Sequence, residues 1–97
     1  MAIQIDPEQN ERSALSRIGV KFDGAHVLEV GAGDGRFTRA FVSAAKSIIA
    51  IEPDRDFASD FRSQQWPGHV EFHPVGIEKF DPGGRRFDVI VFSWSLC

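Results

Sequence analysis

The sequence predicts an α/β fold with a parallel sheet and helices on both of its faces. Short apolar runs alternate with segments of helical periodicity, and a glycine-rich turn joins the first of these runs to the next helical segment. The second run is apolar without interruption, which is typical of a strand covered on both sides. With 97 residues, 42% of them apolar, the chain has room for a single domain over residues 1–97.

The N-terminal half is expected to contain a helix, a strand and a second helix. A helix is expected from Asp6, with Pro7 at its first position. His26–Val30 is short, rich in β-branched residues and bounded by glycines, so we expect a strand there. The Gly31–Gly35 turn follows, and apolar residues then recur at helical spacing from Phe37 to Ala44, which predicts a helix of about ten residues.

Three further elements are expected in the C-terminal half. Ser47–Ile51 reads as a buried strand, and Asp54 can cap a helix whose inner face carries Phe57, Ala58 and Phe61. His69–His73 alternates, as an edge strand does, and Phe87–Phe92 is expected to be the fourth strand. About four parallel strands joined by right-handed crossovers form a Rossmann-like sheet.

The candidate site lies where the carboxyl ends of these strands meet, because open parallel sheets bind ligands there. Four features follow the four strands in turn: the Gly31–Gly35 loop, Glu52, the pair Gly76 and Ile77, and the pair Ser93 and Trp94.

The loop favours a cofactor without phosphate. Arg36 stands where a dinucleotide fingerprint has its third glycine, and Asp34 would place a negative charge beside a pyrophosphate. No Gly-Lys-Ser or Gly-Lys-Thr of a P-loop follows. A ligand that carries an ammonium and a sulfonium would instead be attracted by Glu29 and Asp34.

The segment from Glu29 to Gly35, Glu-Val-Gly-Ala-Gly-Asp-Gly, resembles the first motif of class I S-adenosylmethionine-dependent methyltransferases, E/D-x-G-x-G-x-G. The likeness runs from about Leu15 to Leu96. It implies S-adenosyl-L-methionine as the cofactor, with Glu52 on both ribose hydroxyls and Glu29 orienting the loop. The loop residues expected beneath the methionine part are Gly31, Ala32, Gly33 and Gly35.

The same resemblance implies further cofactor-binding positions. Pro53, Gly76 and Ile77 belong to this set, with Ile77 beside adenine, although the family commonly has Asp where this chain has Gly76. Ser93 and Trp94 are expected at the rim of the methyl-transfer site. No catalytic residue is identified, and no Asn-Pro-Pro-Tyr or Asp-Pro-Pro-Tyr follows the fourth strand.

No metal site is expected. His69 and His73 have a spacing that suits two ligands on a helix, but on a strand residues four apart are separated by about 13 Å.

The implied function is methyl transfer to an unidentified acceptor, for which a small molecule is favoured. Two alternatives stay open: a module or truncated remnant that binds the cofactor or S-adenosylhomocysteine without catalysis, and a NAD-dependent oxidoreductase. Cys97 is the only cysteine and no apolar run reaches membrane length, so we expect a cytoplasmic protein that does not enter a membrane. Because the sequence stops soon after the fourth strand, we expect a partial domain, with that strand's edge open to a second copy or a partner chain.

Overall fold

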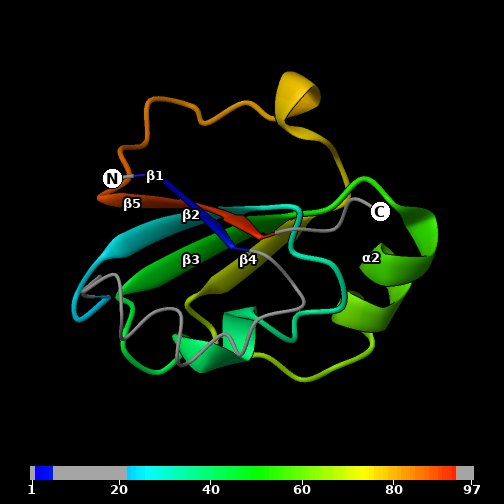
Figure 1. Cartoon of the computed structure of the whole chain (residues 1–97), viewed down its shortest axis with the longest axis horizontal. Coiled ribbons are helices and arrows are strands. Elements are labelled where there is room, and N and C mark those ends of the chain that lie inside the picture. Colours follow the sequence, from blue (N-terminus) through cyan, green and yellow to red (C-terminus); the bar gives the residue numbers. More distant parts are fainter. Residues whose placement is uncertain (1, 6–21, 94–97) are drawn as a thin grey trace.

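A single parallel sheet organises the protein. A computed structural model of the chain describes residues 2–5 and 22–93. The strands are β1 (Ala2–Ile5), β2 (His26–Val30), β3 (Ser47–Ile51), β4 (Val70–His73) and β5 (Val89–Ser93). They pair in the order β1-β5-β2-β3-β4, all parallel, so that their carboxyl ends share one edge of the sheet (Figure 1).

The strands expected from the sequence are present. β2 and β3 have the predicted bounds, and β4 lies at an edge, which confirms the interpretation of its alternating pattern. β5 begins at Val89, two residues later than expected. Asp88 precedes it: its N–H donates to the His26 carbonyl at 2.8 Å, and its carboxylate accepts from the His26 N–H at 2.8 Å.

β1 corrects one prediction. It pairs with β5 from Ala2 opposite Ile90 to Ile5 opposite Ser93. The expected open edge of the fourth strand is therefore wrong, because β1 covers it, and association of another chain through that edge loses its basis. Four residues are too few for periodicity to distinguish a strand from a loop. The helix expected from Asp6 lies outside the described residues.

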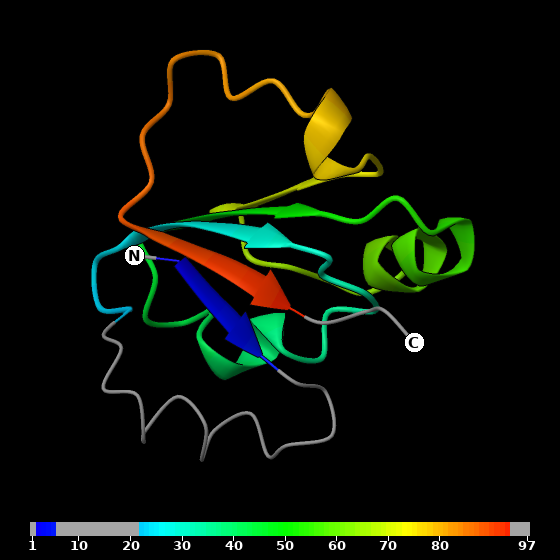
Figure 2. The same ribbon diagram turned by 45° about the horizontal axis from the view of Figure 1, so that its top comes forward.

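Apolar side chains cover both faces of the sheet. Alternation along β2 sends Val27 to one face and Leu28 to the other. The larger cluster is aromatic-rich and holds Phe41 and Phe61. Figure 2 shows the short 3-10 helices η1 (Thr38–Ala40) and η2 (Ile77–Lys79) on opposite sides of the sheet.

The segment after the glycine loop is wound more tightly than predicted. In place of a helix of about ten residues, the chain forms η1 and then turns as far as Ala44. Its hydrogen bonds mix three- and four-residue spacings: Phe41 N–H donates to Thr38 O and Ala45 N–H to Phe41 O. Of the predicted inner face, Phe37 and Phe41 are nevertheless buried, whereas Ala40 and Ala44 are half-buried, so the periodicity identified its two aromatic residues correctly.

The predicted helix after β3 is present as α2 (Arg55–Arg62). The Asp54 carboxylate accepts from the N–H groups of Asp56 at 2.9 Å and Phe57 at 3.0 Å, as a helix N-cap does. Ala58 and Phe61 are buried, but Phe57 is 40% exposed, so its expected place on the inner face is wrong. Within the described ranges, no helix has the length and apolar character needed to span a bilayer.

Candidate functional site

The glycine loop begins where β2 and β3 end together. The N–H groups of Gly31 and Ala32 both donate to the Ile51 carbonyl at 3.0 Å, which extends the pairing of the two strands into the loop. Gly31, Gly33 and Gly35 have φ values of 75°, 62° and 90°. Side chains at three left-handed positions would strain the backbone, so the spacing of the glycines follows directly from the shape of the loop.

Glu52 is brought to this loop from the end of β3. Its side chain is buried, with 1% exposure. One carboxylate oxygen accepts from the Gly33 N–H at 2.7 Å and the other from the Asp54 N–H at 2.9 Å. A carboxylate has about four acceptor positions, and these two backbone N–H groups fill two of them. The sequence predicted that Glu52 and the loop belong to one site, and the structure joins them by a hydrogen bond.

Glu29 lies inside the protein, behind the loop. Its side chain has no exposed surface, and its carboxyl group accepts hydrogen bonds from the hydroxyls of Thr38 and Ser93. Burial raises the pKa of Glu29 to about 7, against the lowering effect of those two hydroxyls and with a smaller contribution from the Glu52 charge. Glu29 therefore ties β2 to β5 and to η1, which suits the expected orienting role and leaves no surface for contact with a ligand.

Ser93 is the last residue of β5. It is buried, and its hydroxyl points to Glu29 inside the protein. The hydroxyl is thus engaged inside the protein, and a place for Ser93 at the rim of a methyl-transfer site stays a prediction. Trp94, predicted beside it, lies outside the described residues. The sequence analysis did not identify Thr38, whose hydroxyl also donates to Glu29, because only the folded chain brings Thr38 and Glu29 together.

Pro53, Gly76 and Ile77 lie beyond the ends of β3 and β4, which are in register from Ile48 opposite Val70 to Ile51 opposite His73. Pro53 is exposed and Ile77 is 48% exposed, so both present apolar surface at this edge of the sheet. Gly76 is buried, and a Cβ there would lie 2.6 Å from the Glu78 carboxylate. The absence of a side chain at Gly76 thus leaves space for the side chain of Glu78.

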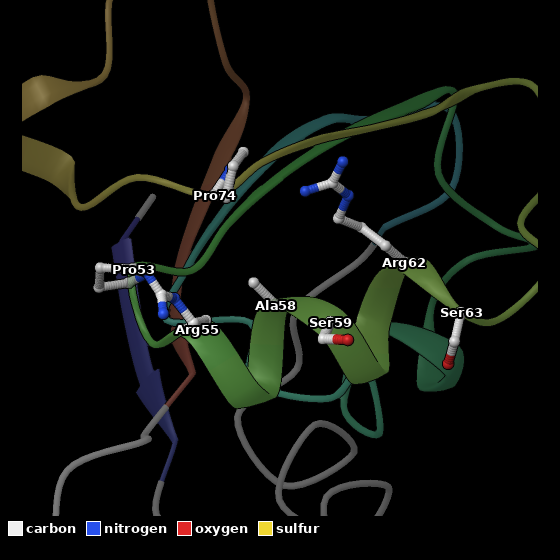
Figure 3. Close-up of a pocket in the computed structure, with 7 residues that line it drawn as sticks. All are labelled: Pro53, Arg55, Ala58, Ser59, Arg62, Ser63 and Pro74. Carbon is white, nitrogen blue, oxygen red and sulfur yellow. The ribbon is translucent and has the colours of Figure 1, made fainter.

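A surface hollow of about 590 Å³ lies next to this edge, along α2 (Figure 3). It is lined by Pro53, Arg55, Ala58, Ser59, Arg62, Ser63 and Pro74. Of the predicted site residues only Pro53 belongs to it, so the hollow is separate from the glycine loop.

His69 and His73 each contact another group of the protein. His69 donates from Nε2 to the Val42 carbonyl at 2.6 Å, and His73 contacts Glu71 on its own strand. In the part of the chain that the structure describes, no three His, Cys, Asp or Glu side chains are grouped so as to hold a metal ion.

A family model described as a methyltransferase domain matches residues 27–97, which include the loop, Glu52 and β5. The chain belongs to this methyltransferase family. The resemblance drawn from the motif at Glu29–Gly35 and the Rossmann-like fold class are thereby confirmed.

The relatives are much longer than this chain. Ribosomal RNA small subunit methyltransferase A of Rhodopseudomonas palustris is 31% identical over 88 residues, which cover 84% of this chain and 31% of the relative. A polyketide synthase–nonribosomal peptide synthetase of Pyricularia grisea, pyiS, is 30% identical over 95 residues, covering 87% of this chain and 2% of the relative. The chain thus spans less than a third of either protein.

Among solved structures, phosphoethanolamine N-methyltransferase 1 of Haemonchus contortus superimposes with a TM-score of 0.72 and 17% identity. The match covers 88% of this chain and 18% of that one. At this identity the likeness establishes the fold.

Proposed function

We propose that this chain is the cofactor-binding part of an S-adenosylmethionine-dependent methyltransferase. One observation carries the proposal: Glu52, at the end of β3, is hydrogen-bonded to Gly33 of the glycine loop in a chain of the methyltransferase family. The H. contortus relative of the same fold is described in complex with S-adenosylhomocysteine, which supports the same class of ligand here.

The residues fit such a cofactor. The two remaining acceptor positions of the Glu52 carboxylate suit the two hydroxyls of a ribose. The exposed apolar surfaces of Pro53 and Ile77 suit an adenine ring, and the left-handed loop at Gly31, Gly33 and Gly35 leaves backbone groups free of side chains. When bound, the cofactor supplies a sulfonium methyl group, which passes to a nucleophile while the sulfur keeps the electron pair of the broken bond.

A dinucleotide is a poorer fit. The Arg36 N–H, at the end of the loop, already donates to the Asp34 carboxylate at 3.0 Å. A pyrophosphate at this place would meet a negative charge and lose a donor to it. This contact supports the methyltransferase reading over a NAD-dependent oxidoreductase.

We further propose a small-molecule acceptor. The formal net charge of −3 gives no long-range attraction for a polyanion, although the R. palustris relative is named for ribosomal RNA. Labelled methyl groups from S-adenosylmethionine should appear in a small-molecule extract and not in ribosomal RNA. Label in the RNA would reverse the assignment. The cytoplasmic location expected from the sequence stays a prediction.

Calorimetry tests cofactor binding. S-adenosylhomocysteine should release heat on titration into the chain, and NAD should not. Glu52→Gln keeps the shape of the side chain but removes its charge and one acceptor, so affinity should fall by about 1 to 3 kcal/mol. Glu71→Gln is the matched control, because Glu71 lies exposed on β4 in an ion pair with Arg85. Equal affinity in the wild type and Glu52→Gln would remove Glu52 from the site, and no heat from either ligand would overturn the proposed function.

A further inference from the structure

The chain just after α2 contacts the glycine loop from outside the expected cofactor site. Gln64, half-buried, donates from Nε2 to the Asp34 carbonyl at 2.5 Å and to the Asp60 carbonyl at 3.1 Å. Its Oε1 accepts from Arg39 Nε at 3.0 Å. One amide side chain therefore links the loop to the last turn of α2 and to η1.

The contact fixes one peptide group of the loop on both of its sides. The carbonyl of Asp34 accepts from Gln64, and the N–H of the same peptide group, which belongs to Gly35, donates to the Ala32 carbonyl at 3.1 Å. Rotation of this peptide would break both hydrogen bonds. It would also change φ of Gly35, which is 90° in the structure.

Trp66 stands behind the same peptide. A Cβ at Gly35 would lie 2.5 Å from the indole ring, so the ring fills the space next to the loop. The ring is itself held in place: it stacks on Phe61 at 4.5 Å between centroids, its Nε1 donates to the Phe61 carbonyl at 2.8 Å, and the Arg39 guanidinium lies 4.5 Å above it.

The two ends of the loop are thus anchored to different elements. Glu52 holds Gly33 from the end of β3, and Gln64 holds the peptide between Asp34 and Gly35 from the end of α2. Only one residue separates Gly33 from Gly35. The second anchor therefore acts on the loop one residue away from the first.

We propose that Gln64 is a positioning residue of the cofactor site: its amide N–H holds the Asp34–Gly35 peptide in the orientation that gives the loop its binding shape. Gln64 acts through the loop backbone and not by touching the ligand. The effect on ligand affinity rests on the proposed function, whereas the effect on the loop does not.

Neighbouring glutamines provide a matched pair of variants. Gln64→Ala removes the contact. Gln65→Ala is the control, because Gln65 is exposed and makes no hydrogen bond to the residues that the structure describes. Gln64→Glu keeps the acceptor for Arg39 but removes the donor to Asp34, so it should resemble Gln64→Ala if that donor is what matters.

The first measurement needs no ligand. Amide hydrogen exchange at Gly35, followed by NMR, should be roughly three- to tenfold faster in Gln64→Ala and Gln64→Glu, the loss expected for one hydrogen bond. Gln65→Ala should exchange as the wild type does. Unchanged exchange at Gly35 in both Gln64 variants would overturn the proposal.

The second measurement is the affinity for S-adenosylhomocysteine by calorimetry, well below the unfolding temperature of every variant. Both Gln64 variants should bind roughly three- to tenfold more weakly than wild type and Gln65→Ala. Faster exchange with unchanged affinity would assign Gln64 a purely structural role and overturn its positioning role. A wild-type chain that does not bind this ligand would overturn the proposed function, and exchange at Gly35 would still decide whether Gln64 holds the loop.

Discussion

The buried carboxyl group of Glu29 predicts that stability falls as pH rises toward neutrality. Burial raises the pKa of Glu29 from 4.5 to about 7 in the folded chain, whereas the unfolded chain keeps the ordinary value. Between these two pH values the folded state holds a proton that the unfolded state has released. The contribution of Glu29 to stability is therefore fully present below about pH 4.5 and is lost as the pH passes 7.

The gap between the two pKa values corresponds to about 3 kcal/mol of unfolding free energy by pH 8. Glu29→Gln is the appropriate perturbation, because an amide stays neutral at every pH. It also offers one acceptor and one donor to the hydroxyls of Thr38 and Ser93, as the protonated acid does. The variant should lack this part of the pH dependence and become the more stable protein above pH 7.

Urea unfolding followed by circular dichroism at pH 4.5, 6, 7 and 8 measures the effect, provided that the denaturant slope is the same in both proteins. The advantage of Glu29→Gln over wild type should grow by about 3 kcal/mol across this series. Glu71→Gln is the control, since hydrogen bonding to His73 lowers the pKa of Glu71 below its usual 4.5. Its stabilising effect is lost only on acidification below this series, so the difference between Glu71→Gln and wild type should stay nearly constant from pH 4.5 to 8. A difference between Glu29→Gln and wild type that does not vary with pH would refute the reasoning.

Three further substitutions test the packing around the site by thermal and urea unfolding. Gly35→Ala places a methyl group 2.5 Å from the indole ring of Trp66 at a left-handed position, so it should lower the free energy of unfolding by at least about 2 kcal/mol. Gly68→Ala lies in open space and should change it by no more than about 0.5 kcal/mol. Similar values for the two variants would contradict the tight contact at Gly35. Phe61→Ala removes a fully buried ring and should cost about 3 to 5 kcal/mol, against less than about 1 for the exposed Phe57→Ala. If the two phenylalanines cost the same, the assignment of the inner face of α2 is wrong. Asp54→Ala removes the cap of α2 and should cost about 1 kcal/mol, and an unchanged melting temperature would speak against that cap.

Local signals made much of the fold predictable. The strand bounds at His26–Val30 and Ser47–Ile51, the Asp54 cap and the glycine turn each depend on residues within a few positions of one another. The pairing of Glu52 with the loop was predictable for a further reason, since parallel strands bring their carboxyl ends to one edge whatever their order.

The errors have physical causes that lie outside such signals. β1 is stabilised by pairing with β5, far along the chain, and four residues carry no pattern of their own. Periodicity placed Phe57 on the inner face of α2, but Phe57 and Ala58 are adjacent on the helix and only the sheet decides which of them is covered. The contacts of Glu29 with Ser93 and of Gln64 with Asp34 are tertiary, and no spacing rule anticipates them.

The position of β5 between β1 and β2 has a consequence for synthesis on the ribosome. β1 and β2 are made early, but β5, the strand that pairs with both, is not available until Val89–Ser93 has left the exit tunnel. Insertion of a late strand between two earlier ones closes long loops and is a slow kind of folding step. In a nascent chain stalled before Val89, β2 can pair with β3 but leaves its other edge unpaired, and the backbone groups of that edge are open to a chaperone or to another unfolded chain.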